Sequence, residues 1–198
     1  YVPQDLDASL VRAVVGAFLQ RGSQVVREYS SDPYFQFLMR DEASGVHFEF
    51  LNASNDVSPF FFLAMQAQQF IPPDSVASRL HADLFLEFGK VCYQVLRPRY
   101  AFAESPDLFV EWSDIDAARI AHVCWAQFFG PQFVEGVGRE ILLNAPAWRN
   151  ENLGDGGVLY VLSASPYLSR GSRQYWAAAR QYFEHHIDGP IIWSDMAE

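Results

Sequence analysis

At 198 residues the chain has the length of one ordinary domain, and a composition that is 50% hydrophobic and 16% aromatic excludes a disordered segment. Asp and Glu number 24 against 14 Lys and Arg, and the resulting net charge of −10 argues against nucleic acid or an anionic membrane as partner. The charge favours encounter with a basic partner, although solubility alone is the alternative reason for the acidity.

No run of apolar residues approaches the roughly 20 that a membrane-spanning helix needs. The longest, from Phe60 to Met65, is far shorter. We therefore expect a single domain over residues 1–198, located in the cytoplasm. The sequence starts at Tyr1 rather than Met, so a periplasmic location after removal of a leading signal segment is the alternative.

The beginning of the chain predicts a helix followed by a hairpin. Apolar residues recur at four-residue spacing from Leu6 to Phe18 and predict an amphipathic helix that ends before Gly22. Residues 35–51 then alternate between apolar and polar side chains on both sides of a turn at 41–45. This alternation predicts two antiparallel strands with one buried face.

A long central helix is the strongest pattern in the chain. It begins after the proline pair at 72–73, carries apolar residues along one face for about six turns, and stops before Pro98. An aromatic stretch over residues 60–69 precedes it and predicts a strand.

The second half of the chain predicts short strands interspersed with helices. Because the strands look hairpin-joined and do not alternate strictly with helices, we expect an α+β fold, with an antiparallel sheet and helices packed on one face. The expected segments are strands at 100–104, 122–129, 148–152 and 158–162, helices at 131–143 and 172–185, a turn at 154–157 and an apolar tail at 191–193.

Two cysteines, Cys92 and Cys124, are too few for a disulfide framework, and each lies among apolar residues. His122 and Cys124 would face the same side of one strand, which makes a nucleophile and base pair conceivable. A catalytic thiol, however, needs an accessible and electropositive site. We expect both cysteines to be small core residues.

The five histidines lack the close spacing of metal ligands. His185 and His186 end a predicted helix, where an imidazolium interacts favourably with the helix dipole. We expect no metal site.

Other catalytic patterns are absent or weak. No nucleophile elbow, P-loop or dinucleotide-binding fingerprint occurs, and Ser163 and Ser165 run into a proline as in a turn. Glu151 and Asp155 offer a pair of carboxylates of the kind that any acidic protein contains. We expect no catalytic residues and no cofactor.

The acidic stretch over residues 104–116 is the most informative local signal. It contains no Lys or Arg, and aromatic residues lie among its acidic ones. Such a surface suits a basic protein partner, although a solvated loop whose aromatic residues pack inward is the alternative. The residues that we expect to contact the partner are Glu104, Asp107, Glu111, Trp112, Asp114 and Asp116.

Several segments rich in Gly, Pro and Trp carry a family resemblance over roughly residues 80–170. They are Leu96–Tyr100, Trp125–Pro131, Gly138–Glu140, Leu143–Pro146 and Asp155–Ser163, with Pro166. Together they resemble the bacterial immunity proteins of polymorphic toxin and type VI secretion systems.

The resemblance implies a small α+β protein without enzymatic activity that neutralises one cognate toxin by covering the toxin's active site. No binding residue carries over, because partner-facing surfaces vary in such families. We therefore expect a protein that binds a basic toxin. One alternative is a small enzyme whose site assembles only in space, from residues such as His122, Cys124 and Asp155. Another is a structural domain that dimerises through the apolar residues 191–193.

Overall fold

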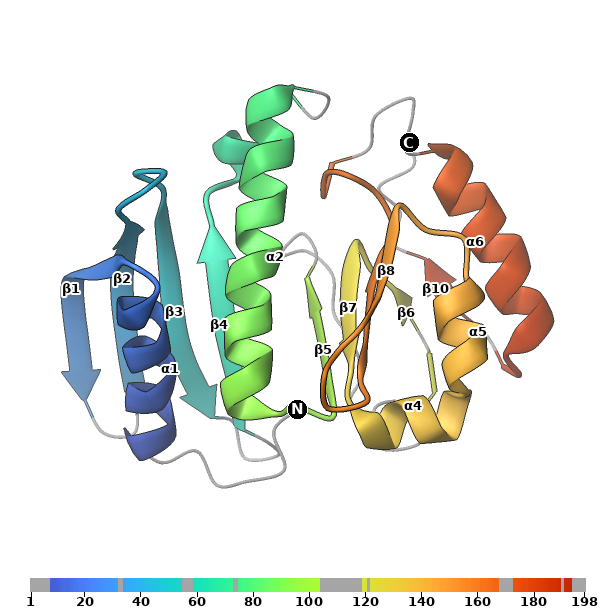
Figure 1. Ribbon diagram of the computed structural model, residues 1–198, viewed down its shortest axis with the longest axis horizontal. Helices are drawn as coiled ribbons and strands as arrows, with labels where there is room; N and C mark the ends of the chain where they lie inside the picture. The colour runs from blue at the N-terminus through green and yellow to red at the C-terminus, as the bar shows by residue number, and fades with distance from the viewer. Residues whose placement is uncertain are drawn as a thin grey trace. The chain divides into compact units, whose positions relative to one another are not determined.

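The computed structural model describes residues 8–31, 34–54, 59–72, 75–103, 119–120, 122–167, 173–189 and 191–193. The chain divides into two compact units (Figure 1). The N-terminal unit comprises Tyr1–Gln69 and Asp83–Pro98, and the C-terminal unit comprises Phe70–Ala82 and Arg99–Glu198. Both contain helices and antiparallel sheets, so the expected α+β class is confirmed. The expected single domain over residues 1–198 stays a prediction.

The sheet of the N-terminal unit is a meander in which each strand pairs with the next one along the chain. All three pairings are antiparallel, and the expected hairpin over residues 35–51 is confirmed as β2 and β3. The elements of this unit are α1 (Ala8–Gln20), β1 (Ser23–Ser31), β2 (Tyr34–Asp41), β3 (His47–Ser54), β4 (Pro59–Met65) and most of α2 (Val76–Leu96), whose first residues belong to the C-terminal unit.

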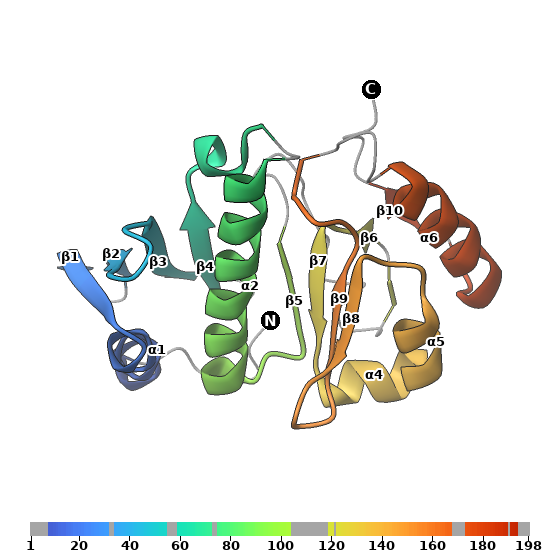
Figure 2. The ribbon, with the colours of Figure 1, turned by 45° about the horizontal axis from the view of Figure 1, so that its top comes forward.

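Helices α1 and α2 cover one face of this sheet (Figures 1 and 2). The sequence dictates this arrangement, because α1 buries residues at helical spacing while β2 and β3 bury every second residue. Phe18 of α1 lies at the centre, with its ring centroid 5.0 Å from that of Phe48 and 5.6 Å from that of Phe88 of α2. Such edge-to-face contacts between fully buried rings hold the helices to the sheet.

The sheet of the C-terminal unit has the strand order β5-β7-β9-β8, with every pairing antiparallel. All four residues of β7 and all four of β9 are buried, so both faces of these central strands are covered. The strands are β5 (Tyr100–Ala103), β7 (Ala126–Phe129), β8 (Arg149–Asn152) and β9 (Val158–Val161).

Three of the described helices belong wholly to the C-terminal unit: α4 (Pro131–Val137), α5 (Arg139–Asn144) and α6 (Arg173–His186). Phe133 of α4 stacks on Tyr100 of β5, with 5.2 Å between ring centroids, and Phe183 of α6 meets Tyr160 of β9 at 5.5 Å. Aromatic side chains therefore attach both helices to the same sheet.

Three expected segments have different bounds. The helix expected over residues 131–143 is interrupted at Gly138, whose φ of 104° lies in a region that a helix does not use. The strand expected over 122–129 is two strands, β6 (His122–Val123) and β7, which pair with different partners: β6 pairs with residues 192–193, and β7 pairs with β5 and β9. The strand expected over 60–69 ends at Met65, and a 3-10 turn, η1 (Ala67–Phe70), follows it.

The expected apolar tail is also part of the fold. Its residues Ile192 and Trp193 form β10, which pairs in parallel with β6. The backbone of this segment is therefore paired within the chain, and the alternative of a dimer through residues 191–193 stays a prediction.

Candidate functional site

The six residues predicted to bind the partner (Glu104, Asp107, Glu111, Trp112, Asp114 and Asp116) lie outside the described residues. Their part in binding stays a prediction. Phe102, at the described end of the strand that leads into this stretch, is 37% exposed.

The two thiols occupy interior positions. Cys124 is fully buried, and burial raises the pKa of the Cys92 thiol from 9.0 to about 12. At neutral pH the Cys92 thiol is therefore protonated and a poor nucleophile, because the thiolate is the reactive form. The prediction that Cys124 is a core residue is confirmed. The structure agrees with the same prediction for Cys92, whose side chain is partly buried.

The residues of the enzyme alternative do not share an accessible surface. Cys124 is buried, whereas Asp155 is exposed at the turn between β8 and β9. There the Asp155 carboxylate accepts a hydrogen bond of 2.9 Å from the Gly157 backbone N–H, which fixes the turn expected at 154–157. The side chain of His122 lies outside the described residues.

The histidine pair lies where it was expected, at the end of helix α6. His186 stacks on Tyr182 with 4.1 Å between ring centroids, and its Nδ1 lies 2.8 Å from the Tyr182 carbonyl oxygen. These contacts are those of a helix C-terminus. Among the described residues no group of three His, Cys, Asp or Glu side chains could hold a metal ion. Over the same residues no helix is both long and apolar enough to cross a membrane.

Ser163 and Ser165 belong to a buried hydrogen-bond network of the C-terminal unit. The Ser163 hydroxyl donates to the Ser165 carbonyl at 2.7 Å, and the Trp125 indole donates to the Ser163 carbonyl at 2.8 Å. The Ser78 hydroxyl donates to the Phe70 carbonyl at 2.9 Å and lies 3.3 Å from the Ser165 hydroxyl. These hydroxyls satisfy buried backbone groups, which is a structural role.

Two surfaces of the N-terminal unit offer room for a partner. The first is the sheet face opposite α1 and α2, here called the open face, which no described helix of the unit covers. Residues paired directly across neighbouring strands share a face, so two rows can be assigned to it. They are Tyr29, Gln36, Leu51 and Phe62 in one row and Arg27, Leu38, Glu49 and Ala64 in the next.

Aromatic side chains occupy the two ends of the first row. Tyr29 on β1 is 62% exposed and Phe62 on β4 is 51% exposed. The neighbouring Phe61 points to the other side of the sheet and stacks on Phe50 in the core. The open face therefore combines two exposed rings with charged side chains of both signs.

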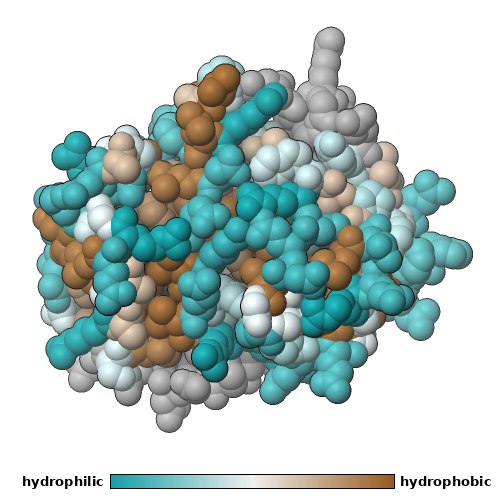
Figure 3. All heavy atoms as spheres, in the orientation of Figure 1, coloured by the Kyte–Doolittle hydropathy of each residue, from teal (hydrophilic) through white to brown (hydrophobic). Residues whose placement is uncertain are grey.

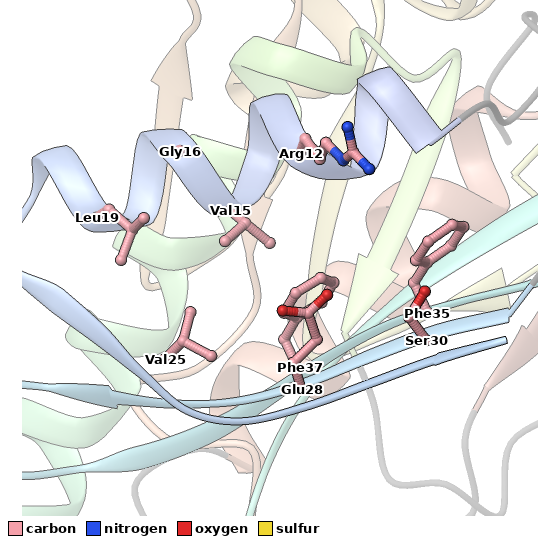
Figure 4. A pocket seen from close by; sticks show the side chains of 9 residues that line it. All are labelled: Arg12, Val15, Gly16, Leu19, Val25, Glu28, Ser30, Phe35 and Phe37. Atoms are coloured by element: carbon pink, nitrogen blue, oxygen red, sulfur yellow. The ribbon is translucent and has the colours of Figure 1, made fainter.

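The second surface is a groove of about 370 Å³ between helix α1 and strands β1 and β2 (Figure 4). It exists because α1 packs its buried residues against β2 and β3, which leaves β1 under the outer flank of the helix. This α1–β1 groove is lined by Arg12, Val15, Gly16 and Leu19 of α1, Val25, Glu28 and Ser30 of β1, and Phe35 and Phe37 of β2.

The groove has an apolar end and a charged end (Figure 4). Leu19 and Val25 face each other across the apolar end and stay 47% and 38% exposed. Glu28 extends its carboxylate from β1 toward the helix, and Arg12 lies on the helix nearer to Phe35. Neither charge has a hydrogen-bond or ion-pair partner among the described residues. In the space-filling view, apolar atoms are exposed over the N-terminal unit on the face that carries α1 (Figure 3).

Sequence patterns missed both surfaces because they missed β1. The strand contains a β-bulge between Val25 and Arg27, which breaks the two-residue alternation on which the prediction depended. The available signal was local. The helix ends before Gly22, which has a φ of 86°, and Val25, Val26 and Tyr29, residues of types that favour strands, follow soon after it.

Comparison of the chain with family models, with curated proteins and with solved structures finds no match in any of the three. The resemblance to immunity proteins therefore rests on the segments rich in Gly, Pro and Trp over roughly residues 80–170. Membership of that family stays a prediction.

Proposed function

We propose that this chain is a non-catalytic binding protein that neutralises a basic protein toxin, as an immunity protein does. The observation that carries the proposal is the open face of the N-terminal sheet, with Tyr29 62% and Phe62 51% exposed. Tyrosine is among the residues that contribute most of the binding energy in protein interfaces, and a sheet holds such anchors rigidly.

The charge of the chain supports a basic partner. The net charge is −10, and acidic residues outnumber basic ones in both units, by ten to six in the N-terminal unit and by fourteen to eight in the C-terminal unit. A field of this sign accelerates encounter with a positively charged protein and is screened by salt. The acidic stretch over residues 104–116 would add to this attraction.

The chemistry of the two cysteines favours binding over the enzyme alternative. Cys124 is inaccessible, and the raised pKa of Cys92 keeps that thiol in its unreactive form.

Co-expression of the chain with the product of the neighbouring gene tests the proposal. The neighbouring product alone should arrest the growth of a bacterial host, and the chain should restore growth by forming a tight 1:1 complex. The association rate of the purified proteins should fall as salt is added. A neighbouring product that is harmless and does not bind the chain would overturn the proposal.

Replacement of the exposed rings tests the open face itself. Tyr29→Ala and Phe62→Ala should each weaken the complex by roughly tenfold or more, as truncation of an interface anchor does. Leu80→Ala is the control, because Leu80 is an equally exposed apolar residue (63%) assigned to the other unit. Unchanged affinity in both aromatic variants would exclude the open face as the contact surface.

A further inference from the structure

Strand β1 forms an edge of the N-terminal sheet. It pairs with β2 from Ser23 to Ser31, apart from the bulge between Val25 and Arg27, and no other described strand pairs with it. An edge strand presents a row of backbone N–H and C=O groups without partners, and an extended chain can pair with them. From Arg27 to Ser31 the pairing of β1 with β2 is regular, so this stretch offers an undistorted template.

The α1–β1 groove lies against the same strand. Helix α1 reverses into β1 through a tight turn, in which Arg21 and Gly22 donate backbone hydrogen bonds to the Phe18 and Leu19 carbonyls. The helix therefore runs alongside the strand. Side chains of a strand alternate between the two faces of a sheet, so a chain added beside β1 would direct every second side chain toward α1.

We infer that β1 and the α1–β1 groove capture one extended segment of a protein partner, which pairs with β1 as a fifth strand and places alternate apolar side chains beneath α1. Backbone hydrogen bonds supply affinity in this mode of recognition, and the groove supplies selectivity. The inference rests on the proposed function, because it takes the partner to be a protein, and it names the segment of that partner which the chain recognises.

The volume and lining of the groove suit such an occupant. About 370 Å³ is room for a few side chains, and Leu19 and Val25 gain burial only when something fills the space between them. Apolar side chains 47% and 38% exposed on facing elements are otherwise unfavourable in a water-filled groove.

Gly16 supports a close approach of the partner to the helix. A glycine in the middle of a helix is destabilising relative to alanine, and a side chain on Gly16 would meet nothing within 4 Å. Packing within the chain therefore does not require a glycine there. Because Gly16 has no side chain, helix α1 projects less into the groove at the point where an added strand would pass.

The charges in the groove define the polar positions of the segment. Arg12 and Glu28 lack partners among the described residues, so they are available to an acidic and a basic side chain of the bound segment. Glu28 in particular suits a basic partner. On the other face of the sheet, Tyr29 follows Glu28 directly, so the outward side chains of an added strand would lie beside the open face.

The bulge in β1 limits the length of the added strand. It interrupts the ladder between Val25 and Arg27 and separates the regular stretch from the start of the strand. Bulges at sheet edges restrict indiscriminate pairing and often lie beside binding sites. We therefore expect the captured segment to be short, with its paired part opposite Arg27 to Ser31.

A random peptide library displayed on phage provides a probe that does not depend on knowing the partner. Selection against the full chain should enrich peptides that alternate apolar with polar residues. Their binding should protect the β1 amides from hydrogen exchange. N-methylation of alternate residues of such a peptide should abolish binding in one register and spare it in the other, because only one set of amides pairs with β1. Enriched peptides that leave the exchange of β1 unchanged would overturn the inference.

A matched pair of variants tests the groove. Gly16→Phe fills it from the helix and should weaken peptide binding by at least about tenfold. Ala13→Phe places the same ring on an exposed position of α1 that does not line the groove, and it should leave affinity unchanged. Equal affinities for both variants would remove the groove from the proposal, provided that circular dichroism shows both to be folded.

The same variants separate this inference from the proposed function. If the chain neutralises the toxin and Gly16→Phe does so equally well, the proposed function stands and the inference about the groove is wrong. If the groove binds peptides but the chain neither binds nor neutralises the neighbouring product, the inference about the groove stands and the proposed function is wrong. Gly16→Phe failing in both assays while Ala13→Phe succeeds in both would support the two together.

Discussion

The two four-stranded sheets, one in each unit, differ in how many of their faces the described residues cover. In the N-terminal unit, β2 and β3 bury only alternate residues, and the face away from the helices carries the exposed rings of Tyr29 and Phe62. In the C-terminal unit, β7 and β9 are buried at every position. One sheet is thus enclosed at its central strands, while among the described residues the other has an uncovered face and an uncovered edge.

This difference separates stability from recognition. A strand buried on both faces contributes apolar burial at each residue and leaves no surface for a partner. A strand buried on one face contributes half as many core contacts, and its other face is free to bind. We therefore expect substitutions in the enclosed sheet to act on folding, and substitutions on the open face or in the α1–β1 groove to act on binding.

The largest effect should come from the one covered face of the N-terminal sheet. Phe18→Ala removes a fully buried ring that contacts both Phe48 and Phe88, and it should lower the free energy of unfolding by about 3–5 kcal/mol. Urea unfolding measures the loss, and hydrogen exchange locates it in this unit. The adjacent Leu19, 47% exposed, is the control, since Leu19→Ala should change stability by less than about 0.5 kcal/mol.

Alkaline pH should lower the stability of the N-terminal unit, because the thiol of Cys92 ionises more readily in the unfolded chain than in the folded one. Its pKa is raised from 9.0 to about 12 by burial, so above pH 9 the unfolded chain releases this proton while the folded chain retains it. The folded state then binds more protons, and the free energy of unfolding falls as pH rises from 9 toward 12, by up to about 1.4 kcal/mol per pH unit. Below pH 9 the contribution is fully present.

Cys92→Ala isolates that contribution. Urea unfolding at several pH values should give a shallower decline above pH 9 for this variant than for the parent chain. Tyr160 of the C-terminal unit also has a pKa raised by burial, and its contribution should persist in the variant. An identical decline in parent and variant would contradict the assignment to Cys92.

A smaller loss of stability should follow when the buried hydrogen-bond network of the C-terminal unit is broken. Ser78→Ala leaves the buried Phe70 carbonyl without its 2.9 Å donor and should cost about 1–3 kcal/mol of unfolding free energy. Ser30→Ala, on the exposed β1, should cost less than about 0.5 kcal/mol. Equal losses in the two variants would contradict the contrast between the units.

The same contrast explains which parts of the fold were predictable from the sequence. Alternation identified β2 and β3 because one face is buried and the other is not, and an uninterrupted apolar run identified β9 because both of its faces are buried. The bulge removed the alternation from β1, so the sequence did not predict this strand. The sheet edge, the groove and the exposed Tyr29 all depend on β1 and were therefore not predicted either. Charge and aromatic content instead directed attention to residues 104–116, which lie outside the described residues.

The smallest effect should be a gain in stability, at Gly16. A side chain there would project into open space, and alanine restricts the unfolded chain more than glycine does, so Gly16→Ala should raise the free energy of unfolding by about 0.5–1 kcal/mol. Gly22 is the matched control, because its φ of 86° is strained for alanine and Gly22→Ala should be destabilising. Urea unfolding of the two variants decides the sign of each change. A loss of stability in Gly16→Ala would mean that the groove wall is closely packed in solution, and an added strand would then have no room beside it. A gain would mean that Gly16 makes α1 less stable than an alanine would, as expected where a surface is shaped for a partner.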